Sequence, residues 1–209
     1  MKKSMLAMSV AAAIGGLGFA GSALAIVDNT TSNAVATDLV VNKGGIGHQL
    51  LFPYFSTQGD NATLINVVNT DTVGKVVKFR FRGAGNSDDL LDFQVLLSPG
   101  DVWTAAVSQD ATSKKSKLTT TDSSCAIGLP TDGLFASLRT DPQKDVGETR
   151  EGYLEVINMA DIITDSALYK TIKHAAATKK PVCDLAVLDA QLGTDIQDEA
   201  AAAARGLTN

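Results

Sequence analysis

The sequence predicts a mainly β protein, an antiparallel immunoglobulin-like β-sandwich followed by C-terminal α-helical segments. Three observations predict this class. Apolar and polar residues alternate with a period of two over residues 46–158. Turn-forming residues separate these runs at intervals of about ten residues. The apolar spacing then lengthens beyond residue 158, as it does where a chain turns from strands to helices.

The first 25 residues have the pattern of a secretory signal peptide. A cationic start at Lys2 and Lys3 precedes an apolar run, and small residues at Ala23 and Ala25 suit a signal peptidase. The run is too short and too weakly apolar for a good membrane anchor. We expect cleavage after Ala25, residues 26–45 as a flexible N-terminal segment, and an exported product in the periplasm, at the cell surface or outside the cell.

The β-sandwich domain is expected over residues 46–160. Lys78, Arg80 and Arg82 alternate with Phe79 and Phe81, which is typical of a half-buried strand. The same alternation predicts seven strands, the number that an immunoglobulin-like sandwich needs. They cover residues 47–55, 62–69, 75–82, 90–97, 102–108, 133–138 and 152–158.

The apolar phases of these strands predict the core, because only face-to-face packing of two sheets buries all of them. The core residues expected from this are Phe79, Phe81, Phe93, Val95 and Trp103.

A long surface loop is expected over residues 109–132, which are rich in Ser, Thr and Lys. The loop contains Cys125, and the other cysteine is Cys183. An even cysteine count in an oxidising compartment predicts a disulfide between them. Two free thiols, one of them catalytic, are the alternative, but no histidine lies near either cysteine in the sequence.

Residues 161–209 are expected to form a helical appendage. Asp161 can cap a helix that carries Leu168, Ile172 and Ala176 at four-residue spacing. A second helical stretch is expected from Asp184, and a last one over residues 196–205. The last stretch has a thin apolar face, so the chain is expected to be the front part of a longer architecture.

Several blocks resemble a little-characterised family of exported bacterial proteins, often labelled cell-surface or hypothetical. They are residues 51–55 (LFPYF), 61–70 (NATLINVVNT), 78–82 (KFRFR), 97–105 (LSPGDVWTA) and 150–157 (REGYLEVI). The resemblance covers about residues 47–160. It implies an envelope or extracellular location, no assigned catalytic residue, and a chain that is the N-terminal part of a longer protein.

Charge and residue counts exclude several classes of function. The formal net charge of −5 disfavours a binder of nucleic acid or anionic membranes, which need a positive field. Two cysteines and two histidines cannot build the usual four-ligand Cys/His metal site. We expect no cofactor and no metal, and no segment that spans a membrane once the signal is removed.

Catalytic residues are sought first among the two histidines. His48 follows a glycine-rich stretch and His174 lies among lysines, and neither accompanies a Gly-x-Ser-x-Gly elbow. We interpret both as surface or edge residues. The carboxylates Asp88, Asp89 and Asp92 could bind calcium or serve a glycosidase, but they match a calcium loop only loosely and favour a solvated turn.

Two basic or glycine-rich features have simple structural interpretations. Residues 83–85 (GAG) lack the following helix and lysine of a phosphate cradle and favour a hairpin turn. The stripe of Lys78, Arg80 and Arg82 could receive an acidic polymer, but pairing with acids of the neighbouring strand, such as Asp92, is the favoured interpretation.

Aromatic residues make up 5% of the chain, fewer than sugar-stacking modules usually carry. Phe52, Tyr54 and Phe55, around Pro53, are the best candidate ligand-binding group. Pro53 also suits an edge strand. We therefore expect a non-enzymatic exported module with a structural, assembly or adhesion role; the alternative is an extracellular polysaccharide-binding domain, and a secreted hydrolase is less favoured.

Overall fold

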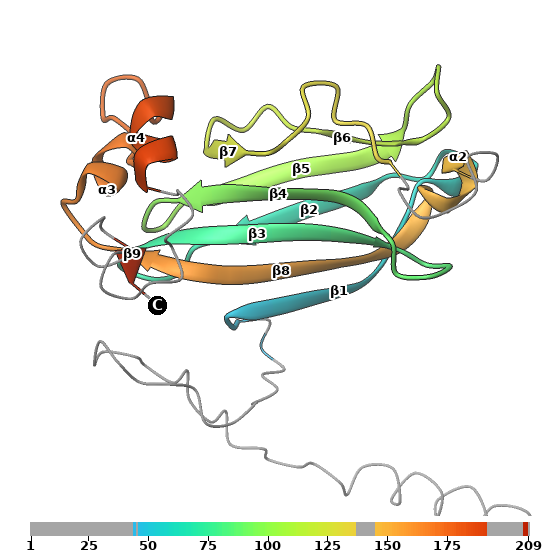
Figure 1. The fold of residues 1–209 in the computed structure, drawn as a ribbon, viewed down its shortest axis with the longest axis horizontal. Helices are drawn as coiled ribbons and strands as arrows, with labels where there is room; N and C mark the ends of the chain where they lie inside the picture. Colours follow the sequence, from blue (N-terminus) through green and yellow to red (C-terminus); the bar gives the residue numbers. More distant parts are fainter. Residues whose placement is uncertain (1–43, 45, 137–144, 192–206, 209) are drawn as a thin grey trace, which may run out of the picture.

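The computed structural model describes residues 44, 46–136, 145–191 and 207–208. In this part of the chain most residues with regular structure lie in strands, which form two antiparallel sheets (Figure 1). The prediction of a mainly β protein with antiparallel sheets is confirmed. The two sheets enclose one apolar core between their inner faces.

The larger sheet, sheet A, has the strand order β1, β8, β3, β4 and β7. A short strand, β9, pairs with the end of β8. The bounds are β1 Gln49–Ser56, β3 Gly74–Gly83, β4 Asp89–Leu97, β7 Cys125–Ile127, β8 Glu151–Ile162 and β9 Leu207–Thr208.

The smaller sheet, sheet B, has the order β2, β5 and β6. Its strands are β2 Thr63–Val68, β5 Val102–Gln109 and β6 Ser116–Thr119. A short 3-10 helix, η1 (Gln58–Asp60), connects β1 in sheet A to β2 in sheet B. The strand orders place β1 at an edge of sheet A and β2 at an edge of sheet B.

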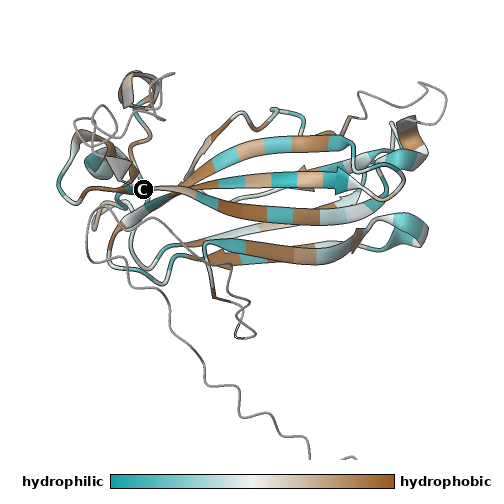
Figure 2. Cartoon of the chain, turned by 60° about the horizontal axis from the view of Figure 1, so that its bottom comes forward, coloured by the Kyte–Doolittle hydropathy of each residue, from teal (hydrophilic) through white to brown (hydrophobic). Residues whose placement is uncertain are grey.

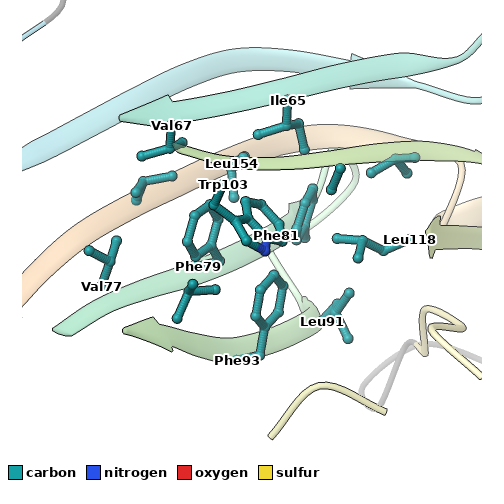
Figure 3. Packing of buried hydrophobic residues seen from close by; sticks show 14 of the residues in the cluster. Ile65, Val67, Val77, Phe79, Phe81, Leu91, Phe93, Trp103, Leu118 and Leu154 are labelled. Carbon is teal, nitrogen blue, oxygen red and sulfur yellow. The ribbon is translucent and has the colours of Figure 1, made fainter. Parts of the chain in front are cut away.

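The predicted core is confirmed. Phe79, Phe81, Phe93, Val95 and Trp103 are at most 1% exposed and belong to one cluster between the sheets (Figure 3). Hydrophilic and hydrophobic residues alternate along the strands, so each strand directs one set inward (Figure 2). The register of β3 on β4 places Phe79 beside Phe93, with ring centroids 5.1 Å apart.

A second apolar cluster lies under two short helices at one end of sheet A. The helices are α3 (Ala167–Ile172) and α4 (Leu185–Gln191). Their buried residues pack on the strand residues of the same cluster, which are Val76, Leu96, Cys125, Ala160 and Ile162. A third helix, α2 (Asp145–Glu148), precedes β8.

The first C-terminal helix begins later than the sequence predicts. β8 continues to Ile162, because Ala160 and Ile162 are buried beneath the helices and remain paired with β3. Ser166, not Asp161, caps α3, since its Oγ accepts a hydrogen bond from the Tyr169 N–H at 3.0 Å. The helix predicted from Asp184 is present as α4.

The segment 109–132 is not one loop, since it contains β6 and β7. Ser116 and Leu118 alternate inward, and this short run is enough to pair with β5. The strand expected over residues 133–138 is reduced to an isolated bridge from Leu134 to Lys117 in its described part. Gly133 has a φ of +64°, which turns the chain away from a strand path.

Three predictions fall outside the described residues. They are the signal peptide over residues 1–25, the flexible segment 26–45 apart from Gly44, and the last helix over residues 196–205. The immunoglobulin-like assignment is not confirmed. Over the described residues the sheets hold six and three strands, whereas that fold divides seven strands into four and three. Among the described residues, no helix is long and apolar enough to span a bilayer.

Candidate functional site

The basic stripe on the outer face of sheet A is paired with acids. The register sets Arg80 opposite Asp92 on β4 and Glu155 on β8. Arg80 Nε lies 3.3 Å from Asp92 Oδ2, and Lys78 Nζ lies 3.2 Å from the same oxygen. Arg82 forms ion pairs with Asp89 and Glu155. The predicted pairing is confirmed, and the three cations are neutralised within the sheet.

The carboxylates expected around the β3–β4 turn have structural roles. Asp89 and Asp92 bind the cations of β3. Asp88 is 2% exposed, and its side chain accepts a hydrogen bond from the Asp89 N–H. Among the residues that the structure describes, no group of three metal-ligating side chains occurs. The three carboxylates thus stabilise the β3–β4 turn and form ion pairs with the cations of β3.

The candidate aromatic group is divided between the core and the surface. Phe55 is 2% exposed and packs against Phe81 with ring centroids 5.5 Å apart. Phe52 faces the same core and is half-buried. Tyr54 points outward, is 61% exposed, and donates to Glu151 Oε2 at 3.1 Å. The irregular register between Phe52 and Phe55 separates the three, so they do not form one stacking surface.

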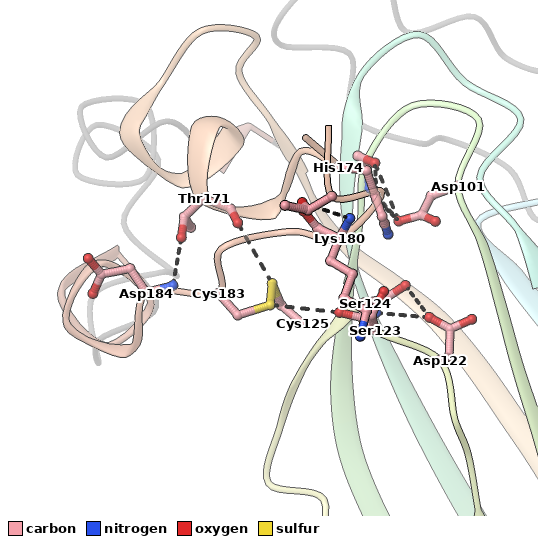
Figure 4. The surroundings of a disulfide bond; sticks show 12 residues. Asp101, Asp122, Ser123, Ser124, Cys125, Thr171, His174, Lys180, Cys183 and Asp184 are labelled. Atoms are coloured by element: carbon pink, nitrogen blue, oxygen red, sulfur yellow. Dashed lines mark hydrogen bonds and ion pairs between the residues drawn. A yellow bond between two sulfur atoms is a disulfide. The ribbon is translucent and has the colours of Figure 1, made fainter. Parts of the chain in front are cut away.

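His174 lies beside a serine and an aspartate, but the arrangement is not a catalytic relay (Figure 4). Ser98 Oγ lies 3.4 Å and Asp101 Oδ2 lies 3.5 Å from the same ring nitrogen, Nδ1. A relay needs the serine on one ring nitrogen and the carboxylate on the other. Ser98 is also 6% exposed. His48 is exposed, and its carbonyl accepts from the Asn158 N–H.

The predicted disulfide is confirmed, with the Cα atoms of Cys125 and Cys183 5.4 Å apart (Figure 4). It joins β7 to the turn between α3 and α4. Thr171 holds the same turn, because its Oγ1 accepts a hydrogen bond from the Asp184 N–H at 2.7 Å. The disulfide therefore fixes α3 and α4 onto sheet A.

A small polar pocket of about 280 Å³ lies between the β3–β4 turn and α2. Its lining residues are Ala84, Gly85, Gly147, Glu148 and Glu151. Glu151 is already held by Tyr54. The other lining residues are alanine and glycine, which add no polar side chain to the two glutamates, and we assign no catalytic role to this pocket.

On the outer face of sheet B, β2 and the first residues of β5 carry exposed, uncharged side chains, whereas β6 carries Lys117 on the same face. Leu64 is 81% exposed, Val68 47% and Val102 41%. The register places Val68 beside Val102 and Asn66 beside Thr104, and all of these side chains face solvent. The solvent-facing side of an antiparallel sheet is usually polar, and these three exposed apolar side chains depart from that pattern.

The backbone of β2 has one open edge. The Asn69 N–H donates to Asp101 O at 2.9 Å, which makes this pair hydrogen-bonded. Thr104, three residues along β5, instead directs its N–H to Asp122 and its carbonyl to the Thr120 hydroxyl, away from β2. Hydrogen-bonded and non-hydrogen-bonded pairs alternate in an antiparallel ladder.

Asn66, opposite Thr104, is therefore a non-hydrogen-bonded residue of the β2–β5 pair. Its backbone N–H and C=O point outward, and so do those of Leu64 and Val68. We call the outward backbone groups of these three residues the β2 edge. Among the described residues, no strand pairs with it. Leu64, Asn66 and Val68 thus present both their side chains and their backbone groups to solvent.

Sequence reasoning did not single out Leu64, Val68 or Val102. The available signal was that β2 carries apolar residues on both phases of its alternation, Leu64 and Val68 as well as Ile65 and Val67. That pattern also fits a strand buried on both faces. No protein-family model matches this chain, and the search of curated proteins found no match.

Proposed function

We propose that this chain is a non-enzymatic exported module that acts by contact with other molecules, in a structural, assembly or adhesion role in the cell envelope or outside the cell. The observation that carries the proposal is the uncharged surface of β2 and the start of β5, where Leu64, Val68 and Val102 are exposed beside the β2 edge. Exposing such residues opposes solubility unless a partner covers them.

Export is part of the same proposal. It is supported by the signal-like pattern of residues 1–25 and by the disulfide, since disulfides persist in oxidising compartments. If the proposal holds, the N-terminus of the exported product is Ile26, which N-terminal sequencing of that product checks. The immunoglobulin-like strand arrangement stays a prediction within this proposal.

The two alternatives have weaker support. A polysaccharide site would use Phe52, Tyr54 and Phe55. Of these three side chains, only that of Tyr54 is well exposed. A hydrolase was based on His48 or His174, and His174 meets Ser98 and Asp101 at a single ring nitrogen. Neither arrangement offers the geometry that its chemistry requires.

Photo-cross-linking in the cells that produce the protein tests the proposal. A benzoylphenylalanine placed at Leu64 should give discrete adducts with a partner on illumination. The matched control is the same residue at Gln94, which lies on the outer face of sheet A. Adducts at position 64 and none at position 94 support a contact role for sheet B. No adduct at position 64, or equal labelling at both positions, would contradict it.

A further inference from the structure

In the part of the chain that the structure describes, the two sheets have four edges, and one of these is unprotected. The edge strand β1 carries Pro53 and a register shift between Phe52 and Phe55, which both hinder pairing. β7 has three residues, and β6 has four, with Lys117 among them. β2 has six residues in continuous register with β5, with no proline and no charge. Such an edge is a template for another strand.

A ledge of core residues lies on β1, the edge strand of sheet A. Leu50 pairs with Val156 and Phe52 with Leu154, and all four side chains face the inside of the sandwich. Val156 is 3% exposed and Leu154 1%, whereas Leu50 and Phe52 are only half-buried. Sheet A is wider than sheet B. We call Leu50 and Phe52 the β1 ledge.

We propose that the β2 edge and the β1 ledge accept an extended, uncharged polypeptide segment as an additional strand of sheet B. Its backbone would bond to Leu64, Asn66 and Val68, and apolar side chains at alternate positions would cover Leu50 and Phe52. This inference rests on the proposed contact function and names its partner class.

The edge itself selects an uncharged segment. Residues 61–69 contain no charged side chain, so a charged strand would lose hydration without gaining an ion pair. Asp60 and Asp71 flank this stretch along the chain, and Asp71 is bound to Lys75 at 2.6 Å. The net charge of −5 further disfavours an acidic segment.

A second copy of β2 does not fit the same place. Antiparallel pairing of two β2 strands about a two-fold axis would put both copies of sheet A on one side of the joined sheet. Because Leu50 and Phe52 are only partly buried, we expect the two copies of sheet A to compete for the space beside β2. A single extended segment brings no second sheet and avoids this clash.

Binding of a labelled peptide to the purified chain tests the inference. The probe is a fluorescein-labelled peptide with the sequence of residues 62–69, which is uncharged and carries apolar residues on both phases of a strand. We expect saturable anisotropy with a Kd on the order of 10–500 μM, as for a small interface. No saturable binding up to about 1 mM would overturn the inference.

Two protein variants separate the edge from the face of sheet B. Asn66→Pro removes an outward N–H without removing a bond to β5, and should weaken binding at least about tenfold. Val102→Lys adds a charge on the same face one strand away, and should weaken it less than about threefold. If Val102→Lys abolishes binding and Asn66→Pro does not, the peptide binds to the outer face of sheet B and not to the β2 edge. That result overturns strand addition and leaves the proposed contact function standing.

N-methylated peptides test the edge with the unmodified chain, so folding of Asn66→Pro does not limit the result. An added strand turns every second amide toward β2 and the others toward solvent. Methylation of one alternate set should abolish binding, and methylation of the other set should leave it within about threefold. Equal affinities for the two methylated peptides would exclude strand pairing. Absence of cross-linking at position 64 would instead contradict the proposed function.

Discussion

Trp103 of β5 packs on Phe79 of β3 across the sandwich, with ring centroids 4.5 Å apart. Each residue lies on the inward phase of its own strand, and each is at most 1% exposed. Their contact joins sheet A to sheet B at the centre of the core (Figure 3). The neighbouring Phe81 extends this cluster toward Phe55 and Phe135.

Phe81→Ala should lower the free energy of unfolding by about 3–5 kcal/mol, because it leaves a cavity among three other rings. Arg80→Ala, on the opposite phase of β3, should cost less than about 1 kcal/mol. Lys78 and Arg82 remain to pair with its carboxylate partners. Urea unfolding of both variants measures the difference; equal losses, or a larger loss for Arg80→Ala, would show that the register is wrong.

Removal of the disulfide should destabilise the chain. Cys125 and Cys183 are separated by 58 residues, so closing this loop contributes on the order of 4 kcal/mol through the unfolded state. Urea unfolding of the Cys125→Ala/Cys183→Ala double variant measures the loss. Non-reduced and reduced intact masses of the wild-type chain should differ by two hydrogens. Equal masses would contradict the bond.

Gly152→Ala should destabilise the junction of β1, β8 and β3. An added Cβ would collide with the Arg82 carbonyl oxygen and lie 3.0 Å from the Phe55 ring. We expect a loss of at least about 1–3 kcal/mol in thermal or urea unfolding. Gly147→Ala is the control, because no atom beyond its chain neighbours and its own helix backbone lies within 4 Å of its added Cβ. Similar stabilities for the two variants would refute the close approach.

Stability at acid pH should depend on Asp71. Burial opposes its ionisation, but hydrogen bonds from Lys75 and Thr72 lower the pKa of its carboxyl below the usual range. A carboxyl with a lowered folded pKa contributes stability above its unfolded pKa, near pH 4, and loses it as the pH falls further. Asp71→Asn should therefore flatten the acid side of the stability profile by about 0.2–1 kcal/mol.

The alkaline side should depend on Lys75. Burial lowers the pKa of its ammonium, but hydrogen bonds to Asp161 and Asp71, each at 2.6 Å, raise it above the usual range. That contribution is complete below the unfolded pKa, near pH 10, and is lost as the pH rises through the folded value. Asp60→Asn, at an exposed position, is the control for Asp71→Asn. An unchanged profile for Asp71→Asn would contradict the pairing.

Local alternation predicted the long strands and the core, because a period of two in 78–82 or 90–97 is decided by neighbouring residues. It missed β6 and β7, whose four and three residues are too short to show a period. It placed a helix cap at Asp161 because an acid before an apolar run resembles an N-terminus. Burial of Ile162 under α3 and α4, a long-range contact, keeps that segment in β8.

The candidate site was less accessible to sequence reasoning. Whether β2 lies at an edge depends on which strand pairs with which, and these pairings join residues far apart in the sequence. The prediction that Phe52, Tyr54 and Phe55 form one binding surface is wrong for a related reason. The register shift in β1 turns Phe55 into the core while Tyr54 faces solvent, and no local pattern marks such a shift.

Amide hydrogen exchange within β2, resolved residue by residue by NMR in the free chain, tests the open edge most directly. The N–H groups of Ile65 and Val67 point to β5 and should be strongly protected, whereas those of Leu64, Asn66 and Val68 should exchange about as fast as exposed amides. Uniform protection of all five amides would contradict the account, because the β2 edge would then already be paired.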